Sequence, residues 1–334
     1  MNLNFGIDHF GDLKNNNYAQ SLKDLVAQAV LADEVGISSY NLGEHHRDDY
    51  AVAAPEIVLS YIAAQTKNIK LGTGVVVLSS DDPVRIYERF AELDALSDHR
   101  MELTVGRGSF TESFPLFGYA LSDYEELFEE KLAMLAEIWK GDPITWKGKH
   151  TQKLNGQRLY PVMDSDNVPL YVAVGGSPES VIRAAHYDLG LRLAVIGGDP
   201  ARFAPFAELY RKSRERFEHT ATRSIGFHSP GLIAETDEKA RELFYGDFEK
   251  INNRIGAERG WMGMDKERFI HEVEHGALFV GSAETVAQKI AKNIKILEAD
   301  TFNLKMGQGT QEAHLDSIRL YGEKVIPMVK DMLS

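Results

Sequence analysis

The chain has 334 residues, of which 43% are hydrophobic and 26% are charged, and it contains no cysteine. The formal net charge of −13 argues against a nucleic-acid partner, because nucleic-acid binding depends on clustered lysine and arginine. The lack of cysteine excludes disulfides, thiolate nucleophiles and cysteine-ligated metals. Neither a signal peptide nor the run of ~20 apolar residues that crosses a membrane is evident, so we expect a cytoplasmic protein with no membrane partner.

Strand-like and helix-like segments alternate along the whole chain. Strands are expected at residues 2–8, 38–43, 69–78, 101–106, 168–174, 191–196, 224–234 and 300–306. Helices are expected to begin near residues 22, 55, 83, 122, 177, 199, 236, 282 and 312. Eight strand–helix units predict an α/β fold, a (β/α)8 TIM barrel that forms one domain over residues 1–334. A doubly wound sheet is the competing fold, and it is disfavoured because no G-x-G-x-x-G motif follows a strand.

Two segments interrupt this alternation. Residues 143–168, after the fourth barrel helix, contain glycine, proline and tryptophan without a helical period, and we expect a β-hairpin excursion there. Residues 248–276, after the seventh strand, read as a long insertion that is at least partly mobile. Loops of this length are uncommon in compact domains and are usually functional or disordered.

Titratable residues gather where the second strand ends, at Glu44, His45 and His46. In parallel α/β folds the carboxyl ends of the strands carry the active site. Successive strand residues point to opposite faces, so the two histidines cannot bind one metal while strand geometry continues. One of them could act as an acid or base in the cleft. From these three residues alone, a histidine that merely stabilises the strand end is an equally good interpretation.

Other strand ends carry features that suit a phosphate. The tract 175–178, GGSP, places two glycines before a serine cap and a proline at the first helical position, which leaves backbone N–H groups free to bind an anion. The pair 281–282 repeats the glycine–serine start, and Arg107 lies between two glycines at the end of the fourth strand. Each feature is common without a ligand, but together they suggest a cofactor that bears a phosphate.

The segment 271–275, HEVEH, matches the H-E-x-x-H pattern of zinc proteases. On a helix, His271 and His275 would share one face and could bind zinc. The pattern has only three fixed positions and no metzincin continuation follows it, so a zinc hydrolase is a weak alternative.

In their order along the chain, several motifs together resemble the bacterial luciferase-like flavin-dependent monooxygenase superfamily. They are LGEHH at 42–46, LGTGVVVL at 71–78, DPVR at 82–85, VGRG at 105–108, YVAVGGS at 171–177 and VGSAETV at 280–286. The resemblance covers nearly the whole chain. It implies a (β/α)8 barrel, usually a homodimer, that binds FMN, or in some branches the deazaflavin F420, at the carboxyl face of the barrel.

The resemblance also implies roles for individual residues. Glu44 would lie near the flavin ring, and His45 would be the catalytic base. The cofactor-binding residues would be Gly74 and Val75, joined by a non-proline cis peptide under the ring, and Arg107, Gly175, Gly176 and Ser177 around the phosphate. The insertion at about 248–276 would be the mobile lid, closing the site with Trp261 and Met262. Aromatic residues at strand ends are candidates for the apolar wall, namely Phe5, Phe110 and Phe114.

The implied function is that of a two-component monooxygenase. A flavin reductase would supply reduced FMN, which would react with O2 to a C4a-peroxyflavin that oxygenates a small organic substrate. An F420-dependent dehydrogenase and a non-catalytic flavin-binding partner are alternatives. Bioluminescence is not implied, because the luciferases have a reactive cysteine in the strand that ends here at Gly106 and an acidic residue at the position of Gly175.

Overall fold

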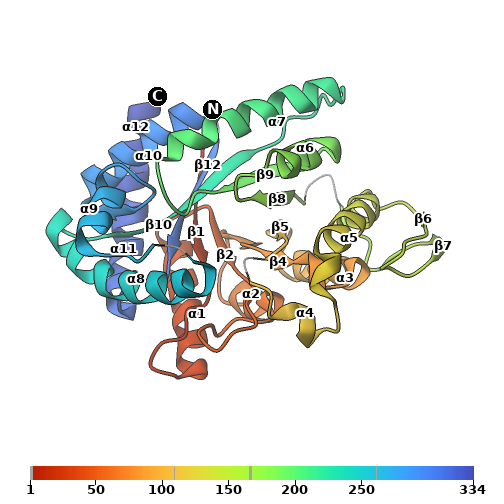
Figure 1. Ribbon diagram of the computed structural model, residues 1–334, viewed down its shortest axis with the longest axis horizontal. Coiled ribbons are helices and arrows are strands. Elements are labelled where there is room, and N and C mark those ends of the chain that lie inside the picture. The colour runs from red at the N-terminus through yellow and green to blue at the C-terminus, as the bar shows by residue number, and fades with distance from the viewer. Residues whose placement is uncertain (1–2, 109, 165–167, 261) are drawn as a thin grey trace.

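A closed parallel barrel forms the centre of the computed structural model, which describes residues 3–108, 110–164, 168–260 and 262–334 (Figure 1). Its strands are β1 (Asn4–His9), β2 (Ser39–Leu42), β3 (Lys70–Thr73), β4 (Val76–Val77), β5 (Leu103–Gly106), β8 (Leu170–Val174), β9 (Gly190–Ala194), β10 (Ile225–Ile233) and β12 (Thr301–Met306). They pair in the order β3-β2-β1-β12-β10-β9-β8-β5-β4. A parallel bridge between Leu71 and Met101 joins β3 to the start of β5 and closes the ring. The predicted (β/α)8 barrel is confirmed, with β3 and β4 as two halves of one strand.

Helices cover the outside of this barrel (Figure 1). They are α1 (Tyr18–Glu34), α2 (Pro55–Ala63), α3 (Pro83–Leu96), α4 (Ser113–Leu116), α5 (Tyr124–Ile138), α6 (Pro178–His186), α7 (Ala204–Arg216), α8 (Asp237–Arg259), α9 (Lys266–Glu274), α10 (Ala283–Leu297), α11 (Gln311–Leu320) and α12 (Ile326–Leu333). Side-chain caps fix several helix starts: Asp82 accepts from the N–H of Val84 and Arg85, and Ser177 accepts from the N–H of Ser180. Within the described parts of the chain, no helix is long and apolar enough to cross a membrane.

Both predicted interruptions exist, but only one has the predicted form. The excursion is a two-stranded antiparallel hairpin of β6 (Ile144–Trp146) and β7 (Leu154–Gln157), as expected. The insertion expected at 248–276 is not a long loop but is largely helical. Helix α8 continues to Arg259 and α9 occupies Lys266–Glu274, because side chains at helical spacing are buried on these helices, including Phe248, Phe269 and Val273.

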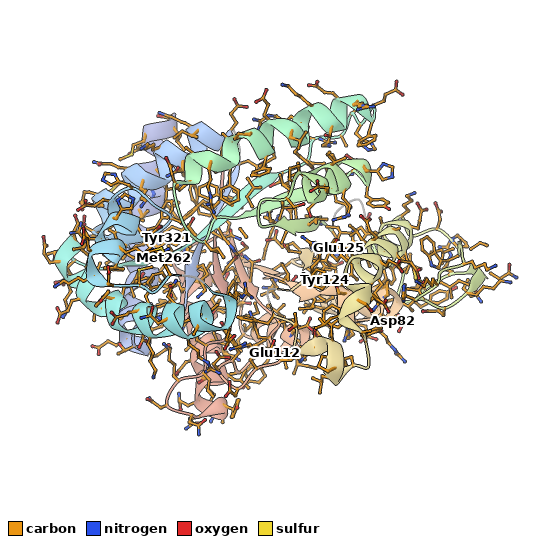
Figure 2. All side chains as sticks on the ribbon, viewed as in Figure 1. Asp82, Glu112, Tyr124, Glu125, Met262 and Tyr321 are labelled. Atoms are coloured by element: carbon orange, nitrogen blue, oxygen red, sulfur yellow. The ribbon has the colours of Figure 1, made fainter. Side chains whose placement is uncertain are left out.

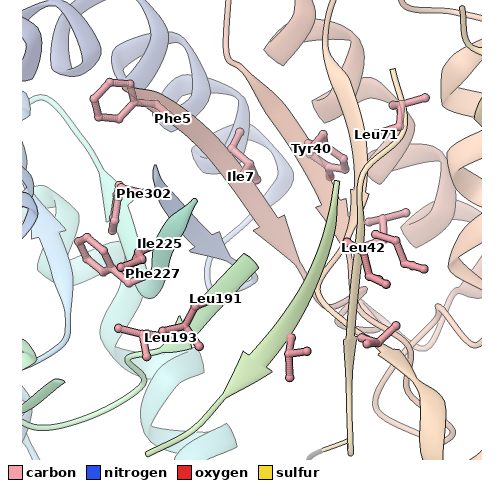
Figure 3. Close-up of a cluster of buried hydrophobic side chains, with 14 of the residues drawn as sticks. Phe5, Ile7, Tyr40, Leu42, Leu71, Leu191, Leu193, Ile225, Phe227 and Phe302 are labelled. Carbon is pink, nitrogen blue, oxygen red and sulfur yellow. The ribbon is translucent and has the colours of Figure 1, made fainter. Parts of the chain in front are cut away.

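Two hydrophobic clusters stabilise the fold. The main core fills the barrel and the space between barrel and helices (Figure 3). Phe5 belongs to this core and is 1% exposed, so its predicted place in a substrate-binding wall is wrong. A smaller cluster lies between α8, α9 and β11 (Phe279–Gly281), with Phe244 and Phe269 at its centre. The second cluster therefore fixes α8 and α9 as a layer at one side of the barrel (Figure 1).

Candidate active site

Two neighbouring cavities open among the carboxyl ends of the strands. The inner cavity lies within the barrel mouth and is lined by Asp8, Thr73, Gly74, Val75, Thr104, Ala173, Arg192, Leu193, Ala194, Phe227, His228 and Asn303. The apolar pocket has a volume of about 130 Å³ beneath α8 and is lined by Phe10, His45, Tyr50, Phe110, Ile196, Pro230, Phe248, Ile251, Asn252, Ile255, Arg259, Lys305 and Gln308. The Phe10 ring separates the two cavities, because it contacts both His45 and His228.

The peptide bond between Gly74 and Val75 is cis, as the resemblance implied. It interrupts the predicted 69–78 strand and borders the inner cavity. A Cβ on Gly74 would make ordinary contact with the Asp8 carboxylate, at 3.4 Å. A Cβ on Gly43 would lie 3.0 Å from the Gly74 carbonyl oxygen, so a side chain at residue 43 would push against the backbone of this segment.

Glu44 holds this cis segment in place. Its backbone N–H donates to the Val75 carbonyl at 3.0 Å, and its Oε2 accepts from the Val77 N–H at 2.8 Å. His46 Nε2 lies 2.8 Å from the other carboxylate oxygen, Oε1. Strand β2 ends at Leu42, so the strand alternation assumed for the two histidines does not apply. Glu44 and His46 thus act as a pair that positions the backbone under the inner cavity.

His45 turns into the wall of the apolar pocket. Its ring stacks on Tyr50 at a centroid distance of 4.1 Å, and its Nδ1 is buried with no hydrogen-bond partner in the described chain. Burial lowers the pKa of His45 to about 4, with Asp12 opposing this shift. The ring is therefore neutral at pH 7 and can accept or donate one hydrogen bond.

A buried polar cluster at the base of the inner cavity was not predicted. Asp8 Oδ1 accepts from the side-chain amides of Asn41 and Asn303, both at 2.8 Å, and Asp8 Oδ2 lies 2.6 Å from His228 Nδ1. The carboxylate orients the imidazole so that Nδ1 carries the proton, and His228 Nε2 is buried without a partner within the described residues. The sequence signal was weak, since His228 lies inside a predicted strand and only barrel closure brings β10 and β12 next to Asp8.

The predicted phosphate-binding residues lie at the rim of β5 and β8. Ser177 caps α6, Gly176 has φ +115°, and a Cβ on Gly175 would find no atom within 4 Å. Arg107 forms an ion pair with Glu125 and lies 5.5 Å from the Tyr124 ring; both partners are labelled on α5 in Figure 2. The charge of Arg107 also contributes to the lowered pKa of Glu179, after the hydrogen bond from Ser177. These interactions show that Arg107 lies near the N-terminal end of α6.

Only part of the predicted apolar wall is correct. Phe110 lines the apolar pocket and contacts His45 at 5.7 Å between ring centroids. Phe114 is fully buried and stacks on Tyr124 instead. Met262 is 77% exposed and is not among the pocket-lining residues, whereas Trp261 lies outside the described residues.

The H-E-x-x-H segment has a structural explanation. His271 lies on α9 and His275 directly follows it as the C-cap residue; their ring centroids are 5.2 Å apart, and His275 is exposed. Glu272 accepts hydrogen bonds from the backbone N–H groups of Gly198 and Ala277. Over the described ranges, no group of three or more His, Asp or Glu side chains could hold a metal ion. The geometry thus gives a zinc hydrolase no support.

Comparison with known proteins decides the family. The family model described as "Luciferase-like monooxygenase" matches residues 3–318. The chain belongs to the luciferase-like monooxygenase family. N-acetyl-S-alkylcysteine monooxygenase of Bacillus subtilis is 30% identical over 294 residues, which cover 82% of this chain and 83% of that protein. An uncharacterised protein of Sinorhizobium fredii is also 30% identical, but the match spans only 56% of that protein's length.

Solved structures share the fold of this luciferase-like protein. The oxygenating constituent of 3,6-diketocamphane monooxygenase from Pseudomonas putida, solved in complex with FMN, superposes with a TM-score of 0.82 at 20% identity over 98% of both chains. An F420-dependent secondary alcohol dehydrogenase, solved with an F420–acetone adduct, superposes with a TM-score of 0.77 at 18% identity, covering 98% of this chain and 99% of that one. The fold is therefore shared by enzymes that carry either cofactor.

Proposed function

We propose that this protein is the oxygenase of a two-component system, which receives reduced FMN from a separate flavin reductase and oxygenates a small organic substrate. The observation that carries the proposal is the inner cavity at the carboxyl ends of the strands, which the Gly74–Val75 segment borders. Arg107 and the start of α6 lie on one side of this segment, at the ends of β5 and β8. On the other side lies the apolar pocket. We also propose that the protein acts in the cytoplasm as a homodimer.

The described residues fit FMN by shape and by charge. Gly74, Ala173 and Ala194 line the inner cavity with little side-chain bulk, and we expect the flat ring to lie along them. Arg107 and the free backbone N–H groups at the start of α6 would hold the phosphate. The phosphate must displace Glu125 from Arg107, but the Glu125 side chain is 63% exposed, and such ion pairs contribute only ~0.2–1 kcal/mol.

When bound, reduced FMN would supply the electrons and the activation of O2 from which one oxygen atom reaches the substrate. The residues of the chain would position the ring and the substrate and exclude water. Glu44 fixes the backbone on which the ring would rest, and the aromatic side chains of the apolar pocket exclude water from the substrate. His45 presents a neutral imidazole to that pocket, where it can hold one hydrogen bond to the substrate or to a reacting oxygen.

Binding of FMN, reduced FMN and F420 to wild type and Arg107→Ala, measured by fluorescence titration, tests this proposal. Loss of a charged phosphate contact is expected to weaken binding of either FMN form about tenfold or more. Arg85→Ala is the matched control, because Arg85 is an exposed arginine on α3 whose side chain pairs only with Glu88 among the described residues; this variant should bind FMN as wild type does.

Three results would contradict the proposal in different ways. Binding of neither FMN form would exclude FMN as the cofactor. Tight binding of F420 alone would instead support an F420-dependent dehydrogenase. If wild type and Arg107→Ala bind FMN with equal affinity, FMN remains the proposed cofactor, but Arg107 does not bind its phosphate.

A further inference from the structure

Lys305 places a buried amine in the otherwise apolar pocket. It is 7% exposed, lies near the end of β12 and lines the pocket, with Nζ 4.8 Å from the centre of the Phe10 ring. In the closed strand order, β12 stands across the barrel from β5, so Lys305 is remote from Arg107 and the start of α6. It is therefore not part of the proposed phosphate site.

The ammonium has no ion-pair partner at contact distance within the described chain. Two carboxylates, Asp8 and Asp12, act on the charge of Lys305, and Asp8 is engaged elsewhere, since it pairs with His228 at 2.6 Å. The second, Asp12, approaches Lys305 across Gly307. A Cβ on Gly307 would lie 2.2 Å from Asp12 Oδ2 and 3.1 Å from Lys305 Nζ. Asp12 thus partly balances the charge of Lys305 from the side that faces away from the pocket, because Asp12 is not among the pocket-lining residues.

The electrostatics of this group favour an anion on the pocket side. Burial lowers the pKa of Lys305, and Asp12 opposes this shift. Lys305 and the other nearby cations lower the pKa of Asp12 against the effect of its own burial, which keeps it ionised. A buried ammonium that lacks a direct partner is costly, and an anion that enters the pocket would remove that cost.

Gln308 provides a second and independent sign of a ligand. It is 3% exposed and lines the same pocket, and its Oε1 has no hydrogen-bond partner in the described parts of the chain. Buried polar atoms are nearly always hydrogen-bonded, so an unpaired one at a cavity indicates a partner that binds there. Rotation about its last bond lets the Gln308 amide present either its oxygen or its NH2 group to a ligand.

We propose that Lys305 and Gln308 bind the anionic head group of the substrate, so that the substrate class is an amphipathic carboxylate whose apolar part lies between Phe10, Phe110 and Phe248. This inference rests on the proposed function, since it names the substrate of that same pocket. The aromatic walls select the apolar part, whereas the ammonium and the amide fix which end of the molecule faces β12.

Octanoate and its neutral isostere octanamide are the probes, and calorimetric titration measures their binding to wild type, Lys305→Met and Lys14→Met. Wild type is expected to prefer octanoate by about tenfold or more, the value for a charged hydrogen bond. Lys305→Met keeps the length of the side chain without its charge and should lose this preference. Lys14→Met removes a neighbouring charge that is not among the pocket-lining residues, and should keep it.

Folding and flavin binding are measured on the same preparations. If Lys305→Met does not fold, because Asp12 then loses its counter-charge, Lys305→Arg keeps the charge and should retain the preference for octanoate. Equal binding of the two probes to wild type, or no binding of octanoate, overturns the inference. If octanoate does not bind but FMN does, the anion site is wrong and the proposed function still stands. If octanoate is preferred but no flavin binds, the proposed oxidoreductase function is wrong and the anion site still stands.

Discussion

His45 shows how a single buried side chain can serve the site and make the fold sensitive to acid. Aromatic rings surround its imidazole, and the described contacts provide no carboxylate within ion-pair distance. His228, in contrast, lies 2.6 Å from Asp8. The two histidines on either side of Phe10 therefore differ in function: one is a neutral wall residue, and the other is oriented by a carboxylate.

The lowered pKa of His45 predicts a stability change with a definite sign. An unfolded histidine binds a proton near pH 6.5, whereas the folded protein resists protonation of His45 until about pH 4. Between these values the unfolded state binds more protons, so stability is complete above pH 6.5 and falls as the pH falls through this window. His45→Gln should reduce the loss between pH 7 and pH 5 by roughly 2 kcal/mol, measured by urea unfolding.

His99→Gln provides a control of opposite sign. The Asp94 carboxylate raises the pKa of His99, which is exposed. Protonated His99 stabilises the folded state below its unfolded pKa, and this stabilisation disappears as the pH rises. The variant lacks this gain at low pH, so its stability should be slightly more sensitive to acid. Identical acid profiles for wild type and His45→Gln would show that His45 does not remain neutral in the fold.

The residues predicted at the site were those that short sequence motifs carry. Glu44, the cis bond after Gly74 and the cap at Ser177 all lie in such motifs; the family resemblance implied the first two, and the GGSP tract predicted the cap. His228 and Lys305 could not be assigned in this way. Their importance comes from parallel pairing of β12 with both β1 and β10, which joins residues about 80 to 300 positions apart in the chain.

At the level of elements, α8 shows why the second half of a predicted helix can be missed. Asn252, Asn253 and Gly256 have low helix propensity, and they suggested an irregular segment. In the structure, Phe248, Ile251 and Ile255 face the apolar pocket at helical spacing. This tertiary burial outweighs the local propensity.

Ion pairs attach the same helix to the barrel rim. The Arg47 guanidinium donates to both oxygens of Glu258, at 2.9 and 2.8 Å, and the Arg47 side chain is 6% exposed. Arg254 pairs with Asp48 at 2.6 Å, and Lys14 pairs with Asp247 at 3.0 Å. If α8 is the lid that the resemblance implied, these contacts hold it closed.

Removal of one contact should loosen the end of α8. Glu258→Gln weakens the bidentate pair by about 1 kcal/mol, so amide hydrogen exchange in residues 251–259 should become roughly fivefold faster. Glu242→Gln is the matched control on the same helix, because Glu242 pairs only with Lys239, three residues away, among the described residues. Equal exchange in both variants would mean that the Arg47 contact does not restrain the helix.

At the scale of the whole molecule, α2 carries an apolar face toward solvent. Ile57 and Tyr61 are 69% and 65% exposed, and they are four positions apart, so they share one side of the helix. Leu96 at the end of α3, which packs beside α2, is 75% exposed. Large apolar side chains gathered on adjoining helices are typical of surfaces that another protein covers.

A second copy of this chain is the partner that we expect on the α2 face. Light scattering coupled to gel filtration should then give twice the mass of one chain, and Ile57→Lys should shift the protein toward a monomer, because a buried charge without a partner destabilises an interface. Ile182→Lys on α6, where the residue is 40% exposed, is the control and should remain dimeric. A monomeric wild type would exclude the homodimer, whereas a dimer that tolerates Ile57→Lys would place the interface on another face. Because Ile57 lies outside both cavities, FMN binding by a monomeric Ile57→Lys variant would further show that one barrel holds the complete cofactor site.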